Sequence, residues 1–66
     1  MNRSEAMQAL REGKKITHVY FTDGEFVYLE EGKVMYEDGA SSSVEFFWSI
    51  RENELWDKGW KIYEES

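Results

Sequence analysis

The chain has 66 residues, no cysteine and no proline, and fourteen acidic against eight basic side chains give a net charge of −6 near neutral pH. A chain of this length forms at most one small domain, so we expect a single domain over residues 1–66. The lack of cysteine excludes disulfides and thiolate metal sites, and one histidine, His18, argues against a histidine-rich metal centre. Because small domains usually need additional support, we expect a homo-oligomer.

The charge balance also bears on partners and location. An acidic chain repels phosphate backbones, so nucleic acid is not an expected partner. No apolar stretch approaches the roughly 18 residues that a membrane span requires. The N-terminal segment is polar and does not read as a signal peptide. We therefore expect a cytoplasmic protein without a membrane partner.

The first expected element is a helix over residues 4–12. Ser4 is the expected N-cap, with Glu5 in the first turn, and Ala6, Met7 and Leu10 fall at helical spacing. Gly13 stands where a left-handed residue would end the helix.

Strands follow, separated by tight turns. Residues 16–22 and 25–30 flank Asp23-Gly24, a strong signal for a two-residue hairpin, and Glu31-Gly32 predicts a second turn before a strand at 33–37. Asp38-Gly39 marks a further turn. The first turn would pair Tyr20 with Val27, and the second would pair Leu29 with Val34 and Tyr28 with Met35.

This register gives a sheet that is apolar on both faces. One face would carry Ile16, His18, Tyr20, Val27, Leu29, Val34 and Tyr36, and the other Val19, Phe21, Phe26, Tyr28 and Met35. One short helix covers only one face, so the second face must meet the rest of the chain, another subunit or a ligand.

The remaining segments complete the expected fold. Residues 40–43 read as a polar loop and 44–48 as a fourth strand. Ser49-x-x-Glu52 resembles a capping box that opens a short helix with Leu55 and Trp56, and Gly59 would end that helix. A last strand is expected at 60–63, and residues 64–66 as a frayed tail. The fold class is α+β, with a short N-terminal helix packed on an antiparallel β-meander and a second short helix before a C-terminal strand.

Catalytic signatures are sparse in this sequence. It has no cysteine nucleophile, no G-x-S-x-G elbow around Ser41–Ser43, no glycine-rich phosphate loop and no HExxH or EF-hand spacing. His18 has no evident orienting acid, so a histidine at the sheet margin is the simpler interpretation. We expect no enzyme, no catalytic residue, no cofactor and no metal.

Ligand binding has better material, because 17 % of the residues are aromatic. Most aromatic residues in a small domain serve its core, but aromatic rings also stack on bases. Arg51, at the expected start of the second helix and near Trp48, suits a phosphate. Glu52, Asn53 and Glu54 in the same turn could hold ribose hydroxyls, although a solvated helix face explains them equally well.

The two ends of the chain resemble one family. The opening S-E-A-M-Q-A-L-R-E-G-K-K-I and the segment Trp48–Trp60, W-S-I-R-E-N-E-L-W-D-K-G-W, resemble the anti-Thoeris sponge proteins of the second kind. The resemblance implies a small helix-and-sheet phage protein that assembles into a homo-oligomer and binds ADP-ribose-derived immune signals without cleaving them. Anti-CRISPR proteins occur among the relatives of that family.

The sequence also departs from the family pattern. The family usually continues Gly-Lys-Lys with an Ala-Arg-Lys-Gly-Trp-Asn-type segment, which Thr17–Thr22 replaces here, and Arg51 stands where a small polar residue is usual. These departures fit a related but distinct signal, such as a cyclic or amino-acid-conjugated ADP-ribose.

The resulting hypothesis is a phage-encoded sponge that sequesters such a signal as a dimer or tetramer in the cytoplasm of the infected bacterial host and so blocks TIR/Thoeris effector activation. The alternative is an acidic protein–protein inhibitor of a host defence enzyme, either an anti-CRISPR or a nucleic-acid mimic. A nucleotide-processing enzyme ranks third. The expected ligand-binding residues are Lys15, Tyr20, Phe21, Trp48, Ser49, Arg51, Glu52, Asn53 and Glu54.

Overall fold

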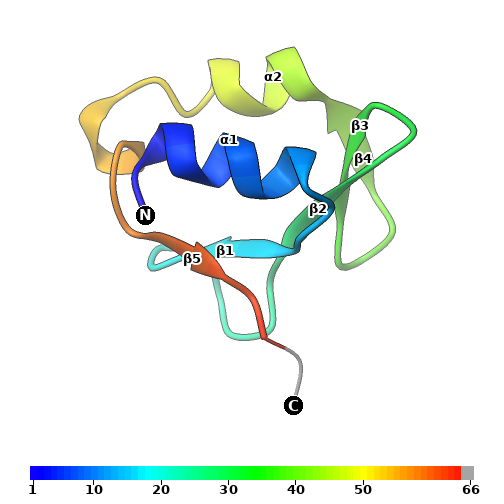
Figure 1. Cartoon of the computed structure of the whole chain (residues 1–66), viewed down its shortest axis with the longest axis horizontal. Coiled ribbons are helices and arrows are strands. Elements are labelled where there is room, and N and C mark those ends of the chain that lie inside the picture. Colours follow the sequence, from blue (N-terminus) through cyan, green and yellow to red (C-terminus); the bar gives the residue numbers. More distant parts are fainter. Residues whose placement is uncertain (65–66) are drawn as a thin grey trace.

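A computed structural model of the chain describes residues 1–64 and shows one antiparallel sheet with helices over one of its faces (Figure 1). The strand order across the sheet is β4-β3-β2-β1-β5. This arrangement confirms the expected α+β class. In chain order the elements are α1 (Arg3–Arg11), β1 (Ile16–His18), β2 (Val27–Glu30), β3 (Lys33–Tyr36), β4 (Ser41–Ser43), α2 (Val44–Ser49), the 3₁₀ turn η1 (Glu54–Trp56) and β5 (Trp60–Ile62).

Helix α1 forms close to the expected place, but its N-cap is Asn2 and not Ser4. The Asn2 side chain accepts from the Glu5 amide at 2.8 Å, and Glu5 Oε1 accepts from the Asn2 amide at 3.0 Å, which completes a capping box. At the other end Gly13, with φ +82°, donates to the Leu10 carbonyl while Lys14 donates to that of Ala9. These two bonds form a Schellman motif, so the expected role of Gly13 is confirmed.

The second hairpin has the expected register. Val34 pairs with Leu29, Met35 with Tyr28 and Lys33 with Glu30. Glu31 and Gly32 both have positive φ, 51° and 78°, as a type I′ turn requires. A two-residue turn fixes the pairing locally, which is why the sequence sufficed here.

The first hairpin differs from the prediction, because β1 ends at His18 and Val27 pairs with Ile16 instead of Tyr20. Residues 19–25, here called the 19–25 loop, leave the sheet. Two turns hold this loop: Phe21 N donates to the His18 carbonyl at 2.9 Å, and Glu25 N donates to the Thr22 carbonyl at 3.0 Å. The shift is even, so Ile16, His18 and Val27 keep their expected face.

Residues 40–56 also differ from the prediction. Ser41–Ser43 form the edge strand β4 instead of a loop, and Val44–Ser49 form a helix instead of a strand. Ser43 is the N-cap, and its Oγ accepts from the Phe46 amide at 3.0 Å. Ser49 therefore ends a helix and does not begin one. The later turn η1 is capped by Asn53.

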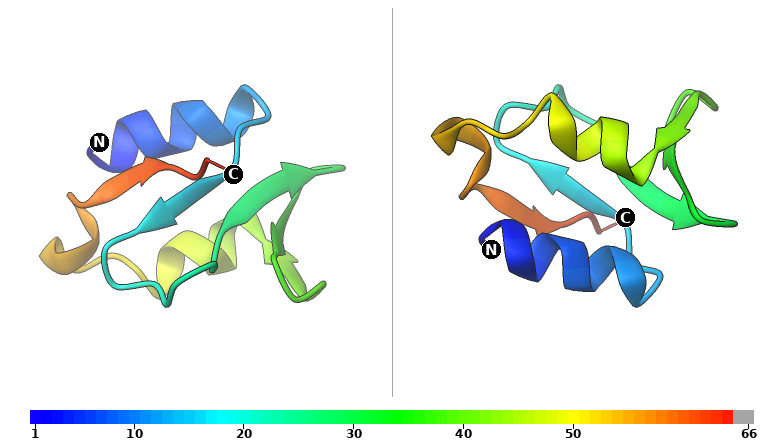
Figure 2. Two further views of the ribbon diagram at one scale, coloured as in Figure 1. Left: turned by 90° about the horizontal axis from the view of Figure 1, so that it is seen from below. Right: turned by 90° about the horizontal axis from the view of Figure 1, so that it is seen from above.

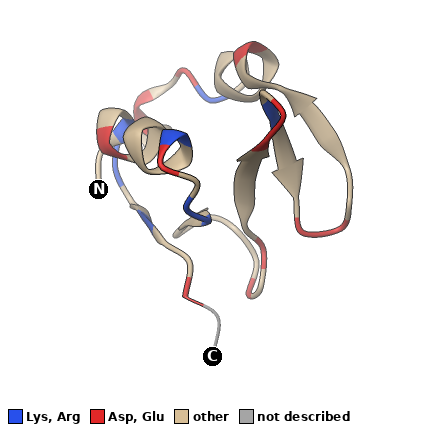
Figure 3. Ribbon diagram, turned by 45° about the vertical axis from the view of Figure 1, so that its right-hand side comes forward, with Lys and Arg blue, Asp and Glu red and all other residues tan. Residues whose placement is uncertain are grey.

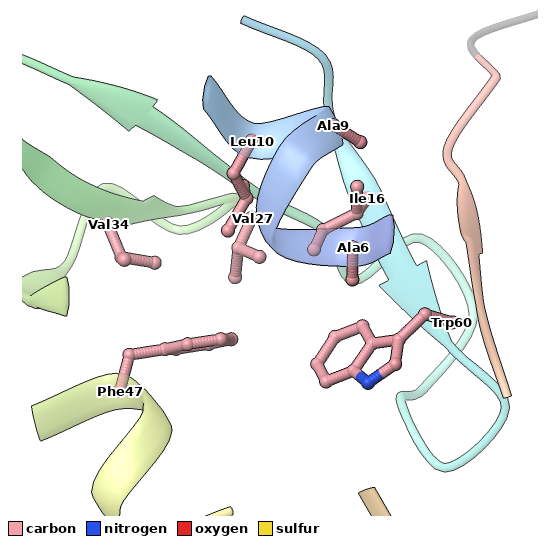
Figure 4. Close-up of a cluster of buried hydrophobic side chains, with 8 residues drawn as sticks. All are labelled: Ala6, Ala9, Leu10, Ile16, Val27, Val34, Phe47 and Trp60. Carbon is pink, nitrogen blue, oxygen red and sulfur yellow. The ribbon is translucent and has the colours of Figure 1, made fainter. Parts of the chain in front are cut away.

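The core lies between the helices and one face of the sheet. Helix α1 packs against β1, β2 and β5, while α2 packs against β3 and β4, and the two views of Figure 2 show both helices over the same face. As Figure 4 shows, side chains from all these layers converge there. The buried apolar residues are Ala6, Ala9, Leu10, Ile16, Val27, Val34, Phe47 and Trp60.

The other face of the sheet has no helix over it (Figure 1). Phe26, Tyr28, Met35 and Tyr63 are half-buried there. Three of them form the uncovered aromatic cluster: the Phe26 ring lies 4.5 Å from that of Tyr63 and 6.2 Å from that of Tyr28. The expected second apolar face therefore exists, although Val19 and Phe21 left it with the 19–25 loop.

Candidate functional site

A groove of about 350 Å³ separates the 19–25 loop from strand β5. This volume lies at the low end of the range for small-molecule sites, about 300–1,000 Å³, so the groove suits one nucleoside-sized group. Its walls combine hydroxyl, carboxylate, ammonium and aromatic groups. The side chains that matter here are Thr17, Phe21, Thr22, Asp23, Lys61 and Tyr63.

The groove wall is built by hydrogen bonds of the loop. Thr17 Oγ1 donates to the Glu25 carbonyl at 2.8 Å, which ties the end of the loop to β1. The Glu25 carboxylate accepts from both the amide and the hydroxyl of Thr22, each at 3.1 Å. The loop is therefore folded by its own polar side chains, and Asp23 at its tip remains exposed.

The groove opens beside the uncovered aromatic cluster. Tyr63 belongs to both, and its amide donates to the Lys15 carbonyl at 2.9 Å. Lys15 Nζ lies 4.7 Å from the centroid of the Phe26 ring and 5.8 Å from that of Tyr28. Figure 3 shows the basic segments of β5 and of the α1–β1 connection near each other, while acidic residues mark several turns. Lysine side chains and flat rings thus occur together on this face.

Two of the expected ligand residues, Tyr20 and Phe21, lie at another place, around Trp56. The Trp56 ring centroid lies 6.0 Å from those of Tyr20 and Phe21 and 4.5 Å from that of His18. Tyr20 is 61 % exposed, whereas Phe21 packs against Trp60 in the core. Tyr20 therefore offers an accessible ring, but Phe21 serves mainly to attach the loop to the core.

Arg51 lies beyond the C-terminus of α2, not at a helix N-terminus as expected. Its guanidinium lies 4.1 Å from the Phe47 ring centroid and 5.1 Å from that of Trp56, and Nη1 donates to the Phe47 carbonyl at 2.9 Å. Its Nε is buried without a hydrogen-bond acceptor in the described part of the chain. Burial lowers the pKa of Arg51, which Tyr36 and Glu25 oppose. Arg51 thus covers the core by cation–π contact.

Two other expected ligand residues, Trp48 and Lys15, lie away from the Trp56 ring. Trp48 lines a smaller apolar groove of about 160 Å³ between α1 and α2, together with Met7 and Leu10. Lys15 is on the opposite face of the sheet, as described above. The structure consequently does not unite Trp48, Arg51 and Lys15 in one pocket.

The polar residues that were expected to hold a ribose have local roles or face solvent. Ser49 Oγ donates to the Phe46 carbonyl at 2.8 Å, and the Asn53 side chain caps η1 by accepting from the Leu55 amide at 3.1 Å. Glu52 and Glu54 are exposed. Of the expected residues, Phe21 lines the groove and Lys15 flanks it.

Sequence reasoning missed Thr22, Asp23, Lys61 and Tyr63 as candidate site residues. Asp23 was interpreted as part of the two-residue turn Asp23-Gly24. Such a turn would have paired the flanking strands directly and left no space for a groove. The missed signal was the pattern Thr22-x-x-Glu25, because a glutamate three residues after a threonine can fold the loop back on itself.

No group of three or more potential metal ligands occurs within residues 1–64, and none of the helices described there is long and apolar enough to cross a membrane. Comparison of the chain with family models, with curated proteins and with solved structures found no match. What the fold and the groove define is therefore a class: a small α+β domain with one polar groove beside an uncovered aromatic sheet face.

Proposed function

We propose that this protein captures an ADP-ribose-type nucleotide signal without cleaving it, as a sponge acting in the cytoplasm of an infected bacterium. The observation that carries the proposal is the groove between the 19–25 loop and β5. It combines Asp23, Lys61 and Tyr63, which supply the three kinds of group that such a ligand needs.

Each group matches one part of the ligand. The Asp23 carboxylate can accept from two ribose hydroxyls, the Lys61 ammonium can pair with a phosphate, and the Tyr63 ring can stack on a flat base. The groove alone is too small for a whole dinucleotide-sized signal, so part of it would extend over the uncovered aromatic cluster towards Lys15. Lys61 is the basic side chain of the groove, whose lining also includes the carboxylates of Asp23 and Glu64.

Stoichiometric capture, and not turnover, fits the arrangement of the side chains. His18 is buried with both ring nitrogens engaged by backbone groups, so it is not placed to act as a base on a ligand in the groove. A released ligand should therefore be chemically intact.

Self-association is part of this proposal. The uncovered aromatic cluster carries three half-buried rings, and a second copy packed there would close the groove from its open side. We expect a dimer or tetramer by analytical ultracentrifugation. Tyr28→Ser should shift the equilibrium between oligomer and monomer towards the monomer, whereas Phe46→Ser, on the helical side of the sheet, should not. A monomeric wild-type protein would remove this part of the proposal.

The test of capture is binding and release. The purified protein is mixed with an extract in which a TIR immune enzyme has been triggered, washed and denatured, and the released molecules are identified by mass spectrometry. An intact ADP-ribose conjugate is expected. Titration calorimetry with that conjugate, or with ADP-ribose itself, then compares Lys61→Gln with Lys58→Gln, an equal charge change at an exposed position outside the groove.

Loss of the lysine should weaken binding about tenfold or more, since a charge-assisted hydrogen bond contributes roughly 1.5–3 kcal/mol. Equal effects of the two substitutions would place the ligand elsewhere. If folded protein releases nothing from an extract with confirmed signal, the alternative becomes the better explanation: an acidic inhibitor that docks on a defence enzyme. Two large apolar side chains, Tyr20 and Leu55, are exposed, and the exposed acidic residues Glu52 and Glu54 closely precede Leu55 in the sequence. These features favour that alternative.

A further inference from the structure

His18 joins the 19–25 loop to the segment before β5. It is 2 % exposed, and its ring lies among those of Tyr20, Phe21, Trp56 and Trp60. The Tyr20 amide is 3.0 Å from Nδ1, and the Lys58 carbonyl is 2.7 Å from Nε2. A backbone N–H can only donate and a carbonyl can only accept. Therefore Nδ1 is the acceptor, Nε2 carries the proton, and the imidazole is neutral.

A second proton on this ring would reside on Nδ1, directly opposite the Tyr20 N–H, and two donors would then face each other. The bond to Lys58 would persist, because Nε2–H remains a donor. Protonation consequently breaks the contact to the loop and leaves the contact to the β5 side in place.

That contact is one of the bonds that hold the β1 end of the loop. The Tyr20 amide lies between two other bonds of the loop, Val19 N to the Gly59 carbonyl at 3.1 Å and Phe21 N to the His18 carbonyl at 2.9 Å. The next residues, Phe21, Thr22 and Asp23, line the groove. The far end of the loop is held separately by Thr17 Oγ1 on the Glu25 carbonyl. Releasing Tyr20 therefore loosens the β1 end of the groove wall, where the Val19 and Phe21 bonds remain, while the other end stays attached.

We propose that His18 is an acid-sensitive latch for the 19–25 loop, such that its protonation releases the Tyr20 amide and loosens the loop wall of the groove. The proposal rests on the proposed function only in identifying the groove as the ligand site. The latch itself is a property of the free protein, and its consequence for function is that a captured ligand would be released under mild acid.

The surroundings of His18 set the direction of its titration. Burial lowers the pKa of His18 below its ordinary value of 6.5, the bond to the Lys58 carbonyl opposes this, and the Arg51 charge adds to the lowering. Of the other titratable groups on the packed segments, Tyr20 has its ring 5.2 Å from that of His18, and Glu25 acts on Arg51. The latch is thus closed where the imidazole is neutral and opens as the pH falls through the lowered pKa.

The experiment follows the ligand-free protein by NMR between pH 8 and pH 4. His18 is the single histidine of the chain, so its ring signals need no assignment by mutagenesis. We expect the neutral Nε2–H tautomer at neutral pH and a titration midpoint below 6.5. In the same step the Tyr20 amide should lose about tenfold of its protection from hydrogen exchange, because it loses its hydrogen-bond acceptor.

The internal control is the Tyr63 amide, which donates to the Lys15 carbonyl in the β1–β5 pairing and should stay protected. A His18→Gln variant should show no such step. If that variant does not fold, the titration of the wild-type protein still tests whether the Tyr20 amide loses protection when His18 is protonated. Equal loss of protection at Tyr20 and Tyr63 would show global unfolding and overturn the latch, as would an unchanged Tyr20 amide after His18 has titrated. Failure to bind any nucleotide would refute the proposed function and leave these readouts intact.

Discussion

Two adjacent phenylalanines in α2 offer the sharpest test of the fold. Phe47 is fully buried and lies 5.0 Å from the Trp48 ring and 6.2 Å from that of Trp60, whereas Phe46 is 55 % exposed. A helix over Val44–Ser49 directs Val44, Phe47 and Trp48 towards the core. A strand would instead place Phe46 on the same side as Val44 and Trp48, with Phe47 on the other. The two alternatives therefore exchange the roles of the phenylalanines.

The expected magnitudes differ widely. Truncation of a buried phenylalanine to alanine costs about 3–5 kcal/mol, while a domain of this length has a total stability of roughly 3–10 kcal/mol. Phe47→Ala should therefore remove most of the free energy of unfolding. At Phe46 the loss of partly buried apolar area is offset by the better helix propensity of alanine, so the change should stay within about 0.5 kcal/mol.

Urea unfolding monitored by tryptophan fluorescence measures both variants, and the denaturant dependence shows whether the transitions remain comparable. A milder pair, Phe47→Leu and Phe46→Leu, keeps the comparison possible if Phe47→Ala does not fold; about 1–1.5 kcal/mol is then expected for Phe47. A larger loss at Phe46 than at Phe47 would refute the helix over Val44–Ser49 and restore the strand.

Two further pairs test the caps and turns by the same assay. Asn2→Ala should lower the free energy of unfolding by about 1 kcal/mol, because it removes the N-cap of α1, and Ser4→Ala should leave it nearly unchanged; equal losses would contradict the capping box. Gly59→Ala should cost clearly more than Gly39→Ala, since both glycines have positive φ, +94° and +92°, but only at position 59 would the new Cβ meet another side chain, 3.0 Å from Val19 Cγ2. A similar loss of unfolding free energy at both glycines would show that Val19 moves aside without cost and that its contact with position 59 is not tight.

Interactions between near neighbours could be predicted from the sequence. The end of α1 at Gly13 needs only a residue that adopts positive φ, and the register of β2 and β3 needs only the two-residue turn at Glu31-Gly32. These signals act within a few residues, so no distant partner can change them. Ile16 and Val27 were assigned to the correct face because the error in the register of the first hairpin is an even number of residues.

The candidate site could not be predicted in the same way. Phe21 belongs by local pattern to a strand, but its half-buried ring packs against Trp56 and Trp60, which are more than thirty positions away. The Tyr20 amide then pairs with the His18 ring instead of a neighbouring strand. The groove exists only because the 19–25 loop leaves the sheet. A prediction that continues the first strand to Thr22 therefore cannot identify the residues that line the groove.

The sequence by itself determined the α+β class, the first helix, the second hairpin and an apolar face without a helix over it. The tertiary structure alone decided that Val44–Ser49 is a helix and that residues 19–25 form a loop. The physical reason is the same in both segments. Val44–Trp48 and Val19–Phe21 are rich in β-branched and aromatic residues, which favour strands weakly. Burial of Phe47 and Phe21 against Trp60 outweighs that preference, since covering a large ring contributes more than the difference between local propensities.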